Sequence, residues 1–219
     1  MAQIFSTTEP TDLLTGLRLA RAAIGRGELI VIPTDTVYGV AADAFSPAAV
    51  QRLLDAKGRG RQSPPPVLVG STAAITALAS SVPPAVSELA EAFWPGALTI
   101  ILPAQESLAW DLGDTNGSVA LRIPNNPITL ELLAETGPLA VSSANLTGEP
   151  VARTAAEAKA ALGDRVAVYL DSGTLGSAAS TILDATAHAA TGAPIRIVRA
   201  GAIGLDALRA VLGERLADS

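Results

Sequence analysis

The sequence alternates short runs of β-branched and aliphatic residues with longer segments that are apolar at every third or fourth position. This alternation constrains the fold more than any other feature, because strands that alternate with amphipathic helices are typical of α/β proteins. Residues 12–24 show the helical spacing, and the apolar run 29–32 after two glycines indicates a buried strand. We therefore predict an α/β fold.

The same patterns predict the order of the remaining elements. Further strands are expected at 67–69, 98–102, 119–123, 139–141, 166–170, 181–183 and 195–198. Further helices are expected at 47–57, 84–93, 127–136 and 205–212. Ser46 before Pro47 is typical of an N-cap followed by proline at the first helical position. Thr154 and Glu157 match a capping box that starts one more helix. No repeat or linker interrupts this order, which indicates one domain over residues 1–219.

The composition limits where the protein works. Hydrophobic residues make up 49% of the chain but aromatic residues only 3%, so the core must consist of Ala, Val, Leu and Ile. No apolar stretch approaches the roughly 18 residues of a membrane span. The first ten residues lack the basic and apolar regions of a signal peptide. We expect a soluble, cytoplasmic protein that does not contact a membrane.

Several catalytic chemistries are excluded by residue usage. The chain has no cysteine, so disulfides and thiolate chemistry are absent. Its one histidine, His188, lies in the Ala- and Thr-rich segment TAHAATG, which we predict to be a surface loop, so neither a Ser-His-Asp triad nor a histidine-bound zinc is expected. The net charge of −6 argues against broad nucleic-acid binding but allows a local basic site for a small anion.

Polar segments follow several of the predicted strands, where open α/β sheets place their ligand sites. PTDTVYG (33–39) brings hydroxyls, a carboxylate and a phenol to a strand end, and SSANLTG (142–148) brings hydroxyl and amide groups. PTDTVYG is equally typical of a turn held by local side-chain hydrogen bonds, and SSANLTG, taken alone, is more typical of a turn than of a ligand site. Ser180-Thr181 and Arg199-Ala200-Gly201 lie beside the last two strands.

A cluster of cations, KGRGR (57–61), ends one predicted helix. Cations at a helix C-terminus complement the helix dipole, which is one explanation for them. Lysine and arginine also hold phosphates together, which is the other explanation. The chain contains no GxxxxGK[ST] motif, so any phosphate would be held by side chains and not by a P-loop.

Seven motifs occur in the order PTDTVYG, KGR, FWPGALT, LRIP, SSAN, STILD and VRAG. Together they resemble the YrdC/Sua5 family of threonylcarbamoyl-AMP synthases, with a match over about residues 28–203 and a motif-bearing core of about 12–203. The chain ends soon after the last motif, so it is similar to the short YrdC form. The resemblance implies a single YrdC-like domain with a twisted mixed sheet flanked by helices around a deep ligand cavity.

The resemblance also implies roles for individual residues. The family signature KxR…SxN corresponds to Lys57, Arg59, Ser143 and Asn145, which would bind the ATP phosphates and carry catalysis, with Arg199 also on the nucleotide. Thr34, Arg122 and Ser180 would bind L-threonine, and the fork of Arg122 suits a carboxylate. Mg²⁺ would be held mainly by the ATP phosphates, with no protein residue as a dedicated metal ligand. We assign FWPGALT to the core or the cavity wall.

The implied reaction is that of a nucleotidyltransferase. L-threonine, bicarbonate or CO₂, and ATP would give threonylcarbamoyl-AMP and pyrophosphate, for N6-threonylcarbamoyladenosine (t6A) at position 37 of tRNA. The implied partner is a downstream tRNA threonylcarbamoyl-transferase complex, with weak tRNA contact as a further expectation. The chain departs from the family at Ser63-Pro64-Pro65-Pro66 and at Leu68, where some members carry a histidine.

Two rival functions remain open at the level of sequence. An RNA-binding module is disfavoured by the charge of −6 and the few aromatic residues. A carbamoyl-transfer step, as in hydrogenase-maturation proteins with similar domains, is disfavoured because this chain has no cysteine and no room for the additional domains of those proteins.

Overall fold

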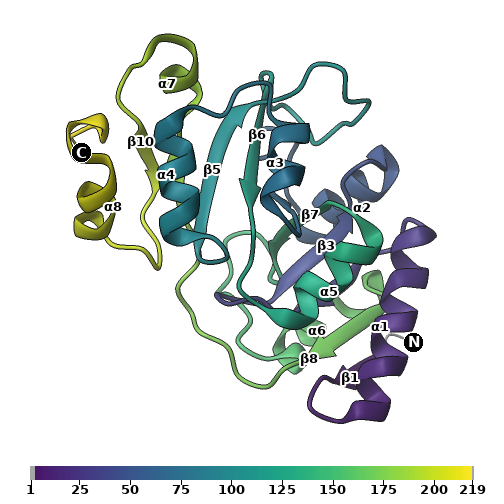
Figure 1. Ribbon diagram of the computed structural model, residues 1–219. Helices are drawn as coiled ribbons and strands as arrows, with labels where there is room; N and C mark the ends of the chain where they lie inside the picture. Colours follow the sequence, from purple (N-terminus) through teal and green to yellow (C-terminus); the bar gives the residue numbers. More distant parts are fainter. Residues whose placement is uncertain (1–2, 219) are drawn as a thin grey trace.

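The computed structural model describes residues 3–218, in which ten strands form one mixed sheet with helices packed against it (Figure 1). The strands are β1 (Gln3–Ser6), β2 (Ile30–Ile32), β3 (Gly39–Asp43), β4 (Val67–Leu68), β5 (Leu98–Pro103), β6 (Ser118–Arg122), β7 (Leu139–Ser143), β8 (Val168–Asp171), β9 (Thr181–Asp184) and β10 (Arg196–Arg199). The predicted α/β class is confirmed. The predicted domain, 1–219, also includes residues 1–2 and 219, which lie outside the described residues. Residues 1–2 are also the first of the ten residues in which a signal peptide was sought.

The strands follow the order β1-β8-β2-β3-β7-β4-β6-β5-β9-β10 across the sheet. Parallel pairs (β1–β8, β2–β8, β4–β6 and β5–β9) are combined with antiparallel ones, which makes the sheet mixed. β8 and β9 are consecutive along the chain yet lie near opposite ends of the sheet. The connection 172–180 therefore spans most of the width of the sheet, and its last residues, Ala179 and Ser180, line the cavity described below.

The helices fall close to the predicted positions. They are α1 (Pro10–Gly25), α2 (Pro47–Lys57), α3 (Thr72–Leu78), α4 (Pro84–Phe93), α5 (Pro127–Thr136), α6 (Ala155–Leu162), α7 (Thr186–Thr191) and α8 (Leu205–Leu212). The side chain of Ser46 accepts a hydrogen bond from the backbone N–H of Ala49 at 3.3 Å, which confirms the predicted N-cap of α2. Thr154 caps α6 in the same way through the N–H of Glu157 at 3.1 Å.

Two strands and two α-helices were missing from the prediction, β1, β3, α3 and α7, as were the short 3-10 helices η1 (Gly163–Arg165) and η2 (Gly213–Arg215). The prediction that His188 lies in a surface loop was wrong, because His188 belongs to the short helix α7 and its Nδ1 contacts the carbonyl of Ala193 at 2.8 Å. β3 (GVAAD) was not predicted from the sequence, because alanine and glycine have little preference for strands. It is a strand because β2 and β7 pair with it on both sides.

The core lies on both faces of the sheet, as the alternation along β2 shows. Ile30 and Ile32 pack with residues of α1 and α5, whereas Val31 packs with residues of α2 and α6. A further cluster joins β5 and β6 to α4 and α8. The side chains are mostly aliphatic, as the composition requires. Within residues 3–218, no helix combines the length and the apolarity needed to cross a membrane.

Candidate functional site

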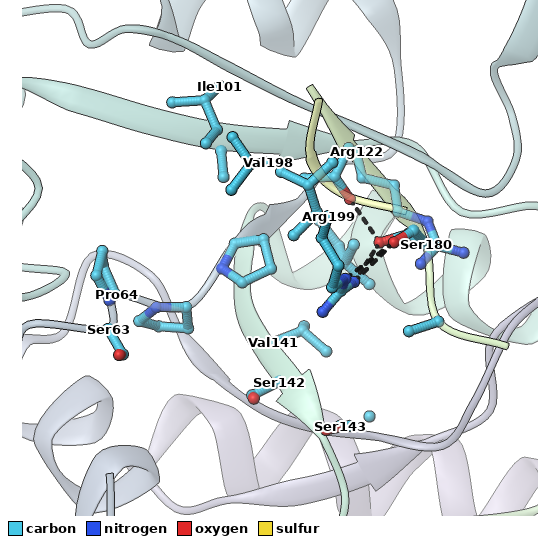
Figure 2. A pocket seen from close by; sticks show the side chains of 18 of the residues that line it. Ser63, Pro64, Ile101, Arg122, Val141, Ser142, Ser143, Ser180, Val198 and Arg199 are labelled. Atoms are coloured by element: carbon cyan, nitrogen blue, oxygen red, sulfur yellow. Dashed lines mark hydrogen bonds between the residues drawn. The ribbon is translucent and has the colours of Figure 1, made fainter. Parts of the chain in front are cut away.

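A cavity of about 390 Å³ lies between the middle strands of the sheet and the segments 34–39, 59–66 and 179–182 (Figure 2). Arg59, Arg122 and Arg199 line it, together with hydroxyl-bearing and aliphatic side chains. Among the described residues that line the cavity there is no Asp, Glu, His or Lys. Guanidinium groups stay charged in proteins, so the cavity lining carries positive charge, which Asp35, paired with Arg122 from outside the lining, offsets in part.

The arginines influence one another electrostatically. Burial lowers the pKa of each of Arg59, Arg122 and Arg199 from its ordinary value. The charge of Arg199 further lowers the pKa of Arg59, and it opposes the charge of Arg122 in the same way. All three arginines line the same cavity. An anionic ligand would relieve this repulsion, so the cavity is suited to an anion.

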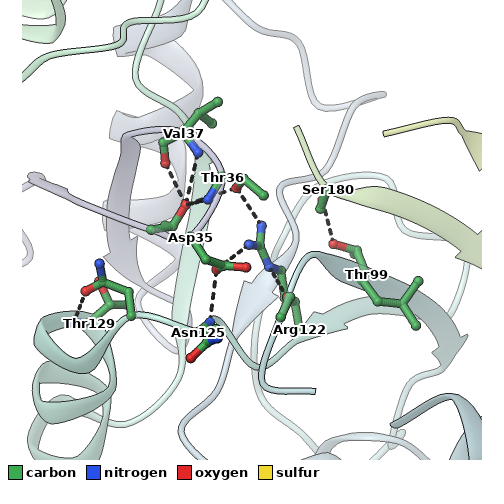
Figure 3. Close-up of polar contacts among 12 residues, drawn as sticks. Asp35, Thr36, Val37, Thr99, Arg122, Asn125, Thr129 and Ser180 are labelled. Carbon is green, nitrogen blue, oxygen red and sulfur yellow. Dashed lines mark hydrogen bonds and ion pairs between the residues drawn. The ribbon is translucent and has the colours of Figure 1, made fainter. Parts of the chain in front are cut away.

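Arg122 is the last residue of β6 and is held from three sides (Figure 3). Its Nη2 pairs with Oδ1 of Asp35 at 2.6 Å, its Nη1 donates to Oγ1 of Thr36 at 3.1 Å, and its Nε donates to the carbonyl of Gly96 at 2.9 Å. Asp35 also accepts from the N–H of Asn125 at 3.0 Å. Because the side chain of Arg122 is only 7% exposed, these bonds fix the guanidinium before any ligand arrives.

Thr34 forms a compact turn with the residues that follow it. Its hydroxyl accepts hydrogen bonds from the backbone N–H groups of Thr36 and Val37, at 3.1 and 3.2 Å. The same hydroxyl donates to the carbonyl of Val37 at 2.7 Å. Thr34 and Thr36 nevertheless both line the cavity. The two interpretations of PTDTVYG, as a turn and as a cavity wall, are therefore both realised.

Lys57 is the last residue of α2 and is buried, with 3% of its surface exposed. Its Nζ donates to the carbonyls of Ser143 and Asn145 at 2.5 and 2.6 Å. Burial, with a smaller effect from the charge of Arg59, lowers the pKa of Lys57 to about 8. Lys57 therefore holds the turn that begins at Ser143, and it is not among the residues that line the cavity.

The end of β7 lines the cavity, and the turn that follows it is held by Asn145. Ser142 and Ser143 line the cavity, and the hydroxyl of Ser142 accepts from Nη1 of Arg59 at 3.1 Å. The side-chain N–H₂ of Asn145 donates to two backbone carbonyls at 2.8 Å, those of Leu146 and Glu149. Oδ1 of Asn145 is buried and has no hydrogen-bond partner within the described part of the chain.

Ser180 and Arg199 meet on the opposite wall, as Figure 2 shows. Nη2 of Arg199 donates to the carbonyl and to the hydroxyl of Ser180, at 2.8 and 3.1 Å. The hydroxyl of Ser180 also lies 2.9 Å from that of Thr99, a residue of β5.

The structure brings most of the predicted site residues to one cavity: Thr34, Arg59, Arg122, Ser143, Ser180 and Arg199. Lys57 and Asn145 do not line it. The predicted site left out six lining residues that carry hydroxyls: Thr36, Ser142, Thr99, Ser63, Thr115 and Ser118. The first two lie within two residues of a predicted site residue, and Thr99 ends the motif FWPGALT, which we had assigned to the core or the cavity wall.

Fold and site together define an α/β protein with a positively charged cavity at the centre of a mixed sheet, suited to a polar, anionic small molecule. Residues 22–201 match the Sua5/YciO/YrdC family model, described as "Telomere recombination". The chain belongs to the Sua5/YciO/YrdC family, and the resemblance stated from the motifs is confirmed.

Curated relatives extend over most of the chain. A Mycobacterium tuberculosis (strain ATCC 25618 / H37Rv) protein, provisionally named as a threonylcarbamoyl-AMP synthase, is 48% identical over 214 residues, which cover 97% of this chain and 96% of the relative. Threonylcarbamoyl-AMP synthase of Pyrococcus abyssi (strain GE5 / Orsay) is 32% identical over 200 residues, which cover 90% of this chain and 57% of the relative.

Solved structures show the same fold. P. abyssi Sua5 in complex with L-threonine superimposes with a TM-score of 0.87 at 30% identity, over 98% of this chain. The chain spans 61% of the length of that protein. E. coli YciO superimposes with a TM-score of 0.82 over 95% of this chain and all of its own, at 22% identity, a similarity that concerns the fold alone.

Proposed function

We propose that this protein is a nucleotidyltransferase that makes threonylcarbamoyl-AMP and pyrophosphate from L-threonine, bicarbonate or CO₂, and ATP. The observation that carries the proposal is the cavity in which Arg59, Arg122 and Arg199 face one another without an acidic side chain among the described lining residues. A ligand set with a carboxylate and a triphosphate complements the cations that Asp35, the partner of Arg122, leaves uncompensated. The named relatives and the family match support the same activity.

The amino acid and the nucleotide are proposed to occupy different walls. Arg122 is held by Asp35 and Thr36, and a guanidinium fixed in this way suits the carboxylate of L-threonine. Arg59, with Ser142 beside it, suits the phosphates on the opposite wall. Arg199 is electrostatically coupled to both other arginines, so we place it between the reacting groups.

The chemistry proposed here relies on positioning and charge. The amine nitrogen of threonine attacks the carbon of CO₂ and loses a proton, which gives a carbamate. A carbamate oxygen then bonds to the α-phosphorus as the bond from that phosphorus to the bridging oxygen breaks and pyrophosphate leaves. Arg59 and Arg199 stabilise the charge that develops on the phosphates. Because no described lining residue is a carboxylate, histidine or lysine, the amine proton leaves to solvent or to the substrates themselves.

Mg²⁺ is part of this proposal as an ion carried by the ATP phosphates, whose charge it would offset. Residues 3–218 contain no group of three or more His, Cys, Asp or Glu side chains that could hold a metal by itself. The oxygen donors near the cavity fit a hydrated ion bound through phosphates. They are the hydroxyl of Ser143 and, two residues further, Oδ1 of Asn145, which lacks a partner within the described residues.

The product would serve the t6A modification of tRNA through a separate tRNA threonylcarbamoyl-transferase complex. A mixed anhydride of a carbamate and a phosphate is readily hydrolysed, so a transferase must take it up soon after release. We propose at most a weak contact with tRNA itself, because the net charge of the chain is −6.

The test is pyrophosphate release from ATP and Mg²⁺, with threonine and bicarbonate each omitted in turn. We expect release that requires both, and a product with the mass of threonylcarbamoyl-AMP. Arg59→Gln should abolish most of the release, whereas Arg215→Gln, which breaks an exposed pair with Glu88, should not change it. Release that needs neither substrate, or no release at all, would overturn the proposal.

A further inference from the structure

Thr99 is a polar residue inside an otherwise apolar strand. In β5, Leu98, Ile100 and Leu102 pack into the core, whereas Thr99 and Ile101 line the cavity, as the alternation of a strand requires. Thr99 is only 1% exposed in the structure, so its hydroxyl is almost entirely removed from solvent. A buried hydroxyl at a cavity wall needs a partner, either in the protein or in a ligand.

Counting donors and acceptors shows how many hydrogens of the Ser180 and Thr99 hydroxyls are already used. Arg199 has only donors, so the hydroxyl of Ser180 accepts from it at 3.1 Å. The hydroxyls of Ser180 and Thr99 share one hydrogen bond of 2.9 Å, which uses one of their two hydrogens (Figure 3). No other acceptor among the described residues bonds to either hydroxyl, so one hydrogen remains for a ligand.

Aliphatic side chains surround this hydroxyl pair. Ile182 of β9 is the strand partner of Thr99, and it lines the cavity with Ile101 and Val198. A neutral donor beside branched aliphatic carbons is complementary to a group that carries a hydroxyl and a methyl on one carbon. It is not complementary to a phosphate, for which the arginines are better suited.

We propose that Thr99 is a specificity-determining residue which, together with Ser180, recognises the side-chain hydroxyl of the amino-acid substrate. This inference rests on the proposed function, since it assigns the hydroxyl pair to the threonine side chain. Thr99 is the member of the pair that can be changed cleanly, because valine has nearly the same shape and lacks only the hydroxyl.

The experiment compares Thr99→Val, Thr99→Ser and a control, Thr181→Val. Thr181 is equally buried, with 1% exposure, but its hydroxyl bonds to Ile203 and does not line the cavity. Pyrophosphate release is measured with L-threonine, and L-2-aminobutyrate, which lacks the hydroxyl, is tested as a substrate or as a competitive inhibitor. Melting temperatures are recorded for every variant.

We expect Thr99→Val to lower kcat/KM for L-threonine about ten-fold, the loss of one hydrogen bond, with the KM for ATP and the constant for L-2-aminobutyrate unchanged. Thr99→Ser should retain most of the preference for threonine, and Thr181→Val should retain all of it. Unchanged kcat/KM for threonine in folded Thr99→Val, or an equal loss with both amino acids, would overturn the inference. A wild-type protein that forms no threonylcarbamoyl-AMP would instead refute the proposed function.

Discussion

Replacement of Lys57 by methionine separates a supporting role from a direct role in ligand binding. The ammonium group donates to two carbonyls, those of Ser143 and Asn145, at the start of the turn after β7. Methionine preserves the length and the apolar part of the side chain but removes both donors. The family resemblance implies that Lys57 binds the ATP phosphates, in which case its replacement would abolish turnover and leave the fold intact. The structure predicts a loss of stability as well.

The magnitude follows from opposing effects. Hydrogen bonds from a charged donor contribute about 1.5–3 kcal/mol each, so the loss of two would cost about 3–6 kcal/mol. Burial of the ammonium offsets part of this, since its pKa falls to about 8 from an ordinary value of 10.5, and each pKa unit corresponds to about 1.4 kcal/mol. The offset is about 3.5 kcal/mol and the midpoint of the loss is about 4.5 kcal/mol, so we expect a net loss of about 1 kcal/mol in the free energy of unfolding. For a chain of 219 residues this lowers Tm by about 2–4 °C.

The assay is thermal and urea unfolding of wild type, Lys57→Met and Lys159→Met, together with pyrophosphate release. Lys159 is the other lysine of the chain and lies in the last turn of α6, away from the cavity lining, so its replacement should leave pyrophosphate release unchanged. Lys57→Met should lose both stability and turnover. Lost turnover with an unchanged Tm would refute the reasoning, because it would show that Lys57 acts on the ligand directly.

Three further predictions concern the cavity and its supports. Arg59→Lys keeps the charge but loses the fork, and should raise the KM for ATP several-fold while the KM for threonine stays constant in steady-state assays. Gly39→Ala would place Cβ 2.5 Å from Cγ1 of Val141 and should cost about 1–3 kcal/mol in urea unfolding, whereas Gly25→Ala, with no neighbour within 4 Å, should cost nothing. The pKa of Lys57, about 8, is depressed, so the unfolded chain binds more protons between pH 8 and about 10. The stability of wild type should therefore rise relative to Lys57→Met across that window, and a constant difference in unfolding free energy would contradict it.

Much of the fold follows from local sequence. The periodicity of apolar residues and the caps at Ser46 and Thr154 predicted most helices and strands to within two residues. Local signals failed where pairing partners decide the structure. β1 and β3 are strands because β8, β2 and β7 pair with them, and His188 lies in a six-residue helix too short to show a period.

The family and the set of candidate residues were determined by the sequence itself, because seven motifs in order identify the family without any knowledge of contacts. What each residue touches was decided only by the tertiary structure. Lys57 and Arg59 are two positions apart, yet one is buried against backbone carbonyls and the other lines the cavity. Thr99 looked like part of a core motif until β5 and β9 paired and placed its hydroxyl beside that of Ser180. Motifs are properties of the chain, whereas burial and hydrogen-bond partners arise between segments that are distant in sequence.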